Sequence, residues 1–169
     1  GQSVTRNTTA EIWKFINSEL DVCASVLPLT QTEKGRITKG AALALKARAL
    51  LYQNKWSEAA TVAKSVMDLN KYSLYPKYED LFSTVAENNA EIILDKQFIK
   101  DIYSNNAFQY LGPYSQKNAN STFVPTKKMI DSYTMSNGKS ISDPTSGYDK
   151  DKPYDNRDPR LKFSVFVKG

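Results

Sequence analysis

Aromatic rings and amide side chains alternate along residues 103–123, a segment with neither a helical nor a strand period. Sugars present flat C–H faces and many hydroxyl groups, so proteins bind them against aromatic rings and pair the hydroxyls with amides. Long loops of this kind are often functional. We therefore predict a loop that binds oligosaccharide. Its predicted ligand-binding residues are Tyr103, Phe108, Tyr110, Tyr114 and Asn118, within a wider amide set of Asn105, Asn106, Gln109, Gln116 and Asn120.

A second interpretation of the same rings stays open. Aromatic side chains are more often packing residues than binding platforms, so each tyrosine could instead pin the loop onto the helical part of the chain. The two interpretations differ most for Tyr110 and Tyr114. If these two rings form a platform, replacing either one should weaken binding and leave stability nearly unchanged.

The segment NRDPRL at residues 156–161 carries a cluster of charges. Its arginines could clamp a carboxylate or sulfate, because guanidinium binds such groups through two parallel hydrogen bonds. Buried arginines usually serve packing and order, so we favour a structural role for Arg157, Asp158 and Arg160. The aspartates at 149, 151 and 155 do not fit a calcium loop, because Tyr154 and Arg160 stand where that loop needs glycine and glutamate. No metal site is predicted.

Catalytic constellations are poorly supported. The chain has no histidine and one cysteine, Cys23, which excludes Ser-His-Asp and Cys-His arrangements and ordinary zinc sites. A carboxylate pair for glycoside hydrolysis would have to come from residues such as Asp80, Glu87, Glu91 and Asp95, which solvated positions explain equally well. We predict a protein that is not an enzyme and needs no cofactor.

Three helices are predicted in the first part of the chain. Residues 8–27 have a capping threonine at Thr8 or Thr9 and Glu11 in the first turn. Residues 38–53, which Thr38 can cap, and residues 56–69 form an Ala-rich helical hairpin that resembles one tetratricopeptide-like pair. The predicted inner faces are Ile12, Phe15, Ile16, Leu20 and Cys23; Ala41, Ala42, Leu45, Ala49 and Tyr52; and Trp56, Ala59, Ala60, Ala63 and Met67, with Ala42, Ala49 and Ala60 at close helix contacts.

The remaining chain is predicted to be loop-rich, with a few short strands. Strands are expected at residues 91–98 and 162–167, and short helices at 78–82 and 125–133. Residues 99–124 and 135–155 are expected to be loops, the second of them exposed. The fold class is therefore mainly α. We interpret residues 1–169 as a single domain or a fragment of one, with a helical sheaf at 1–75, a mixed zone at 76–124 and a third zone at 125–169.

The composition of the chain limits the kinds of partner that we expect for it. The net charge of +5 comes from scattered residues, with Lys127–Lys128 as the only adjacent basic pair, so no nucleic-acid stripe is evident. The sequence contains no run of about eighteen apolar residues, so no membrane span is predicted. The chain shows neither a signal peptide nor a lipobox.

Four ordered blocks of the chain are similar to the SusD/RagB family of outer-membrane lipoproteins. They are GRITKGAALALKARALLYQNKWSEAATVAKSVMDLNKYSLYPKYEDLF from Gly35, NNAEIILDKQF, PTKKMIDSYTMSNGKSI, and YDKDKPYDNRDPRL. The resemblance implies non-catalytic capture of glycan or another nutrient oligomer at the cell surface and delivery to a SusC-like TonB-dependent transporter. It also implies a structural NRDPRL motif, in which the aspartate caps a turn and the arginines bind carbonyl groups.

The resemblance further implies that the chain is an internal fragment, because family members are several times larger and carry a lipid-anchored cysteine at their mature N-terminus. An alternative function is a tetratricopeptide-like scaffold that binds a protein partner. With one hairpin and one preceding helix, the chain has fewer than the three repeats that a free-standing solenoid needs, which favours ligand binding.

Overall fold

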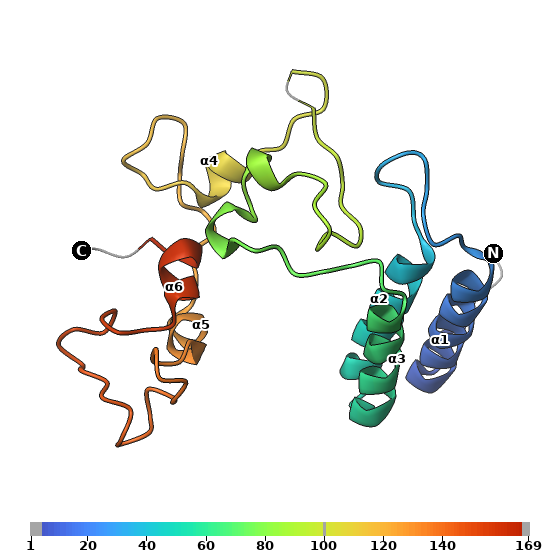
Figure 1. The fold of residues 1–169 in the computed structure, drawn as a ribbon, viewed down its shortest axis with the longest axis horizontal. Coiled ribbons are helices and arrows are strands. Elements are labelled where there is room, and N and C mark those ends of the chain that lie inside the picture. The colour runs from blue at the N-terminus through green and yellow to red at the C-terminus, as the bar shows by residue number, and fades with distance from the viewer. Residues whose placement is uncertain (1–4, 100, 167–169) are drawn as a thin grey trace. The chain divides into compact units, whose positions relative to one another are not determined.

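The computed structural model describes residues 5–99 and 101–166 of the 169-residue chain (Figure 1). The described residues are mainly helical, as predicted. The α-helices are α1 (Thr9–Val26), α2 (Lys39–Tyr52), α3 (Trp56–Asp68), α4 (Ala107–Leu111), α5 (Lys127–Ser132) and α6 (Pro159–Ser164), and the 3₁₀ helices are η1 (Tyr78–Asp80) and η2 (Thr84–Ala86). Within these described ranges no strand forms, and the only β-type pairings are isolated bridges, Ile99 with Tyr103 and Met135 with Arg157.

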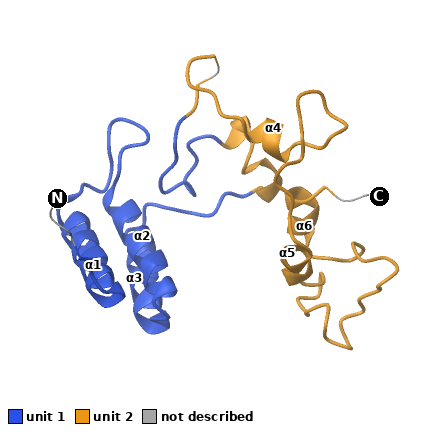
Figure 2. Ribbon diagram, turned by 180° about the vertical axis from the view of Figure 1, so that it is seen from behind, with its two compact units in different colours: residues 1–76, 87–97 blue, residues 77–86, 98–169 orange. Residues whose placement is uncertain are grey.

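The chain divides into two compact units (Figure 2). One contains residues 1–76 and 87–97, and the other contains residues 77–86 and 98–169. The first unit holds α1, α2 and α3, and the second holds the remaining helices and most of the irregular chain.

Helix α1 begins at a complete capping box. The Thr8 side chain accepts a hydrogen bond from the Glu11 backbone N–H, and the Glu11 carboxylate accepts one from the Thr8 backbone N–H. The predicted inner face of this helix is partly wrong, because Ile12 and Phe15 are exposed. The less exposed positions are Trp13, Ile16, Asn17, Leu20, Cys23, Ala24 and Leu27, which follow the same helical spacing rotated by about one residue.

Helix α2 is the centre of the helical layer and packs against both α1 and α3. The predicted tetratricopeptide-like hairpin is confirmed: Thr38 caps α2, and Asn54 adopts a left-handed conformation in the turn that leads to α3. Ala42 and Ala49 are buried as predicted.

Several predicted positions in this hairpin are wrong. The exposed ones are Leu45, Tyr52, Trp56, Ala60, Ala63 and Met67. Ala41 and Ala59 are buried as predicted, and the buried positions that the pattern missed are Gly40 and Leu50 in α2. An Ala-rich helix has small residues on most of its faces, which weakens the periodic signal that sets the phase.

The strand predicted at residues 91–98 is wrong because no neighbouring strand pairs with it. Its backbone groups bond to turns instead: the Ile92 N–H donates to the Asn89 carbonyl over 3.2 Å. The Glu91 carboxylate accepts from the Tyr75 N–H over 2.7 Å. A run of β-branched residues favours a strand only where a partner strand is available.

The strand predicted at residues 162–167 is also wrong, since α6 occupies Pro159–Ser164. Asp158 caps this helix by accepting from the Arg160 N–H, and Pro159 lies in the first turn, where its missing N–H costs nothing. These two starting signals outweigh the alternation of Phe163 and Val165. Residue 167 of the predicted strand lies outside the described residues.

The predicted exposed loop at residues 135–155 contains buried positions. Met135 and Ser146 are both buried, and the Asn137 amide donates to the Ser146 carbonyl over 3.0 Å. Short turns fold this loop back on itself, as where the Asp143 carboxylate accepts from the Thr145 N–H over 2.7 Å.

Candidate functional site

The predicted ligand loop contains a helix that the sequence pattern did not predict. Helix α4 begins where the Asn105 side chain accepts a hydrogen bond from the Ala107 N–H over 3.0 Å. It ends at Gly112, whose N–H donates to the Phe108 carbonyl over 2.8 Å. This single turn of helix places Phe108 and Gln109 on a defined scaffold.

The chain then turns and runs back along α4. Hydrogen bonds between backbone groups join the returning segment to the helix. The Asn120 N–H donates to the Gln109 carbonyl over 2.8 Å, and the Ser121 N–H donates to the Gly112 carbonyl over 3.2 Å. A Cβ atom on Gly112 would lie 2.6 Å from the Phe108 carbonyl oxygen and 2.9 Å from the Ala119 Cβ. The close approach of the two arms therefore requires glycine at this position.

The two arms enclose an open basin of about 550 Å³, which we call the amide basin. The side chains of Asn106, Gln109 and Asn118 make no hydrogen bond to any other residue that the structure describes. Their donors and acceptors face solvent and are available to a ligand. The basin is lined by Asn105, Asn106, Phe108, Gln109, Asn118, Ala119 and Asn120, none of which is ionisable.

Two of the five predicted ligand residues, Phe108 and Asn118, line this basin. Tyr103 instead stacks on Phe98, with ring centroids 5.5 Å apart, and Tyr110 meets Phe123 edge to face at 5.6 Å. Tyr114 is exposed.

The structure therefore does not bring Tyr103, Tyr110 and Tyr114 to the basin, and the binding role of each ring stays a prediction. Four amides from the wider predicted set also line the basin: Asn105, Asn106, Gln109 and Asn120. Ala119 completes the lining. Sequence reasoning missed it, because alanine does not indicate a ligand-binding position.

The charged motif at residues 156–161 separates into two different arginines. Arg157 is buried and donates to three backbone carbonyls, those of Pro153 (2.7 Å), Ile130 (2.9 Å) and Tyr133 (2.8 Å). Its guanidinium also lies 5.7 Å from the centre of the Tyr148 ring. These contacts fasten residues 130–133 to the segment at 148–157.

Arg160 is exposed and forms an ion pair with Asp158. Hydrogen bonds from the Arg160 side chain and backbone lower the pKa of Asp158 from 3.8 to about 2. Asp158 is therefore ionised under ordinary conditions and accepts the hydrogen bond that caps α6.

Within the described ranges, no three histidine, cysteine, aspartate or glutamate side chains converge as a metal site. The helices described here include none with the length and apolar character of a membrane span.

Comparison with known proteins shows which ones this chain is similar to. The model of the SusD family matches residues 90–169. The SusD-like protein P25 of Formosa agariphila is 32% identical over 79 residues, which is 47% of this chain and 15% of that protein.

Two solved structures from Bacteroides fragilis match nearly the whole chain. A SusD-like carbohydrate-binding protein aligns over 99% of this chain and 33% of its own, with 27% identity and a TM-score of 0.82. A SusD-like protein aligns over 95% of this chain and 35% of its own, with 29% identity and a TM-score of 0.71. The chain thus spans about a third of the length of these solved relatives. Motif, sequence and fold therefore all make the chain similar to the SusD/RagB family, with the family model matching its second half and the solved SusD-like structures matching nearly all of it.

Proposed function

We propose that the protein binds a neutral oligosaccharide at the cell surface without chemically changing it, and that the amide basin contributes to this binding. The observation that carries the proposal is the convergence of the unpaired amides of Asn106, Gln109 and Asn118 beside the Phe108 ring. Amides supply donors and acceptors to sugar hydroxyls, and the ring offers an apolar face to sugar C–H groups. A basin lined by no ionisable group suits an uncharged ligand.

The same lining supports a non-catalytic role. Glycoside hydrolysis usually requires a carboxylic acid to protonate the leaving oxygen and a carboxylate on the opposite side of the sugar. None of the residues that line the basin carries a carboxyl group. An oligosaccharide incubated with the protein should therefore be recovered intact by chromatography.

Two variants with a matched control test the basin. Gln109→Ala removes one unpaired amide. Asn118→Gly removes another and keeps the left-handed backbone (φ 67°), which alanine would strain. Each change should weaken oligosaccharide binding several-fold in a calorimetric titration. Gln116→Ala is the control, because Gln116 belongs to the same loop but does not line the basin.

Two results would contradict the proposed role of the amide basin. The proposal fails if both basin variants bind neutral oligosaccharides as tightly as the unmodified protein does. It also fails if Gln116→Ala weakens binding equally, because the effect would then come from the loop as a whole.

The delivery step belongs to the same proposal. A bound oligosaccharide would pass to a SusC-like TonB-dependent transporter in the outer membrane, in keeping with the similarity to this family. Co-expression of the full-length protein with a SusC-like transporter from the same organism should yield a stable complex. Separate elution of the two proteins would contradict the delivery step and leave the binding proposal intact.

A further inference from the structure

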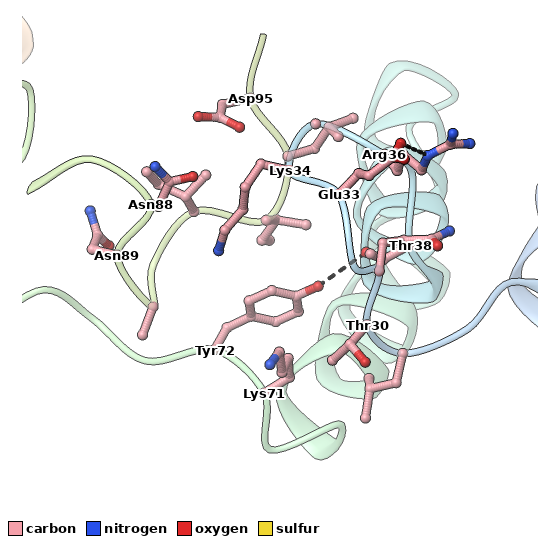
Figure 3. Close-up of a pocket in the computed structure, with 17 residues that line it drawn as sticks. Thr30, Glu33, Lys34, Arg36, Thr38, Lys71, Tyr72, Asn88, Asn89 and Asp95 are labelled. Carbon is pink, nitrogen blue, oxygen red and sulfur yellow. Dashed lines mark hydrogen bonds and ion pairs between the residues drawn. The ribbon is translucent and has the colours of Figure 1, made fainter. Parts of the chain in front are cut away.

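A second concave site lies in the helical unit, away from the predicted ligand loop in sequence. It is a pocket of about 320 Å³, which we call the lysine pocket (Figure 3). This volume falls near the lower end of the roughly 300–1,000 Å³ typical of small-molecule pockets. Its walls come from the connection between α1 and α2, from the residues that follow α3, and from the segment at 88–95.

The walls of the pocket are tied together by hydrogen bonds. The Tyr72 hydroxyl lies 3.4 Å from the Thr38 hydroxyl, across two segments of the chain (Figure 3). The Ser73 N–H donates to the Ala90 carbonyl over 3.1 Å. Hydrogen bonds between separate segments of the chain therefore hold the walls of the pocket together.

The Tyr72 ring lies close against Gly40. A Cβ atom on Gly40 would lie 2.2 Å from the Tyr72 hydroxyl oxygen, so only glycine permits this ring position. The Tyr72 ring thus forms one flat wall of the pocket.

The charges in the pocket are unbalanced. Lys34 and Lys71 both line it, and neither has a carboxylate within 4.0 Å among the residues that the structure describes. Figure 3 shows Lys34 reaching into the pocket, with its ammonium group pointing away from Asp95.

The pocket lining holds more basic than acidic residues. Glu33 pairs with Arg36, whereas Asp95 accepts a hydrogen bond from the neutral Gln97 amide and keeps its charge. The two lysines therefore supply positive charge that no nearby carboxylate neutralises by contact.

We infer that the lysine pocket binds an acidic sugar residue of the uronate type. The carboxylate of the sugar would accept charge-assisted hydrogen bonds from Lys34 and Lys71, while its ring would lie against Tyr72. An ammonium group forms such bonds with a carboxylate from many directions, which suits a pocket open to solvent. This second site differs from the amide basin in the charge of its ligand, and it does not depend on the basin.

Nuclear magnetic resonance titration of the 169-residue chain tests this inference, with glucuronic acid, glucose and inorganic sulfate as the three probes. Glucuronate should shift the backbone amide signals of Tyr72 and Asn88, glucose should leave them unchanged, and sulfate should act more weakly. Added salt should reduce the glucuronate effect, because the contact is partly exposed.

Variants assign the contact to the two lysines. Lys34→Gln and Lys71→Gln should each weaken glucuronate binding about tenfold. Lys14→Gln, at an exposed position on α1 outside the pocket, is the matched control and should bind glucuronate normally. Circular dichroism melts of all three variants confirm that they are folded.

Three results would overturn the inference. They are glucose binding at these residues as well as glucuronate does, sulfate matching glucuronate, and normal glucuronate binding by both pocket variants. Failure of the amide basin is distinguishable, because Gln109→Ala and Asn118→Gly act only on the neutral oligosaccharide.

Discussion

The helical residues 9–68 and the loop-rich residues 101–166 satisfy their backbone hydrogen bonds in different ways. In α1, α2 and α3 the bonds run within each helix, and small or apolar side chains fill the contacts between helices. In the loop-rich part many backbone groups bond to side chains instead, as Arg157 and Asn137 show. Polar side chains there are largely structural.

This difference gives a criterion for recognising candidate binding residues. In a region where most polar side chains hold the backbone, those without such a bond stand out. The Asn105 side chain accepts a hydrogen bond from the Ala107 N–H, whereas Gln109 and Asn118 face an open basin. The predictions below test whether the two regions rely on these different interactions.

The largest effect is expected from Leu50→Ala in α2. Leu50 is 1% exposed, and removing its side chain should destabilise the protein by about 2–5 kcal/mol. Urea unfolding followed by circular dichroism measures this loss. Its neighbour Leu51 is 47% exposed, so Leu51→Ala is the control and should cost much less. Equal losses for the two variants would contradict the described packing of α2.

The next effect should come from Arg157→Met in the loop-rich part. This change removes the Arg157 donors from the part-buried carbonyls of Pro153 and Tyr133, at about 1–3 kcal/mol for each group left unsatisfied, whereas the Ile130 carbonyl keeps the Tyr133 N–H. Hydrogen exchange should then accelerate across residues 130–157. Lysine should not restore protection, because one ammonium group cannot reproduce the planar fork that reaches three carbonyls. Arg160→Met, at an exposed position, is the comparison, and a similar acceleration there would argue against a special role for Arg157.

A smaller, pH-dependent effect is expected at the start of α6. Replacing the capping residue with Asp158→Ala should cost about 0.5–2 kcal/mol. Because the pKa of Asp158 is lowered from 3.8 to about 2, its contribution is present above pH 3.8 and is lost as the pH falls through 2.

Asp158→Asn separates the cap from its charge. Asparagine also caps helices, but it does not titrate, so the exchange rates of α6 should lose this acid dependence. An unchanged acid profile in the asparagine variant would assign the titration to another group.

The smallest effect is expected from the two tyrosines that the sequence suggested as a platform. Tyr110 is 38% exposed and packs on Phe123, so Tyr110→Ala should cost about 0.5–1.5 kcal/mol in the loop-rich part. Tyr114 is 78% exposed, so Tyr114→Ala should leave stability unchanged. Titration of both variants with oligosaccharide decides whether either ring also binds ligand. A loss of binding without a loss of stability would favour the platform.

Helix ends were the most predictable part of the fold. Thr8 with Glu11 and Thr38 before the Ala-rich run are local signals, because each cap involves residues only three apart. Helical phase was less predictable, since it depends on which neighbour covers a face. Phe15 and Leu45 have apolar side chains and suitable spacing, yet both are exposed.

The site was predictable by residue type and less so by arrangement. Amides and aromatic rings identified the loop, and Phe108 and Asn118 do line one basin. The pairing of Tyr103 with Phe98 and of Tyr110 with Phe123 depends on tertiary contacts that the spacing of residues does not encode. The lysine pocket was not predictable at all, because Lys34 and Lys71 are far apart in the chain.

The main-chain bonding of the amide basin bears on how such a site evolves. Gln109 and Asn120 are joined through backbone atoms, and the close approach at Gly112 depends on glycine alone. Mutation can therefore exchange the side chains that face the basin while the loop that carries them keeps its shape. Under the proposed binding role, exchanging Asn106 or Gln109 would change which ligand the basin accepts while the backbone bonds that shape the loop stay in place.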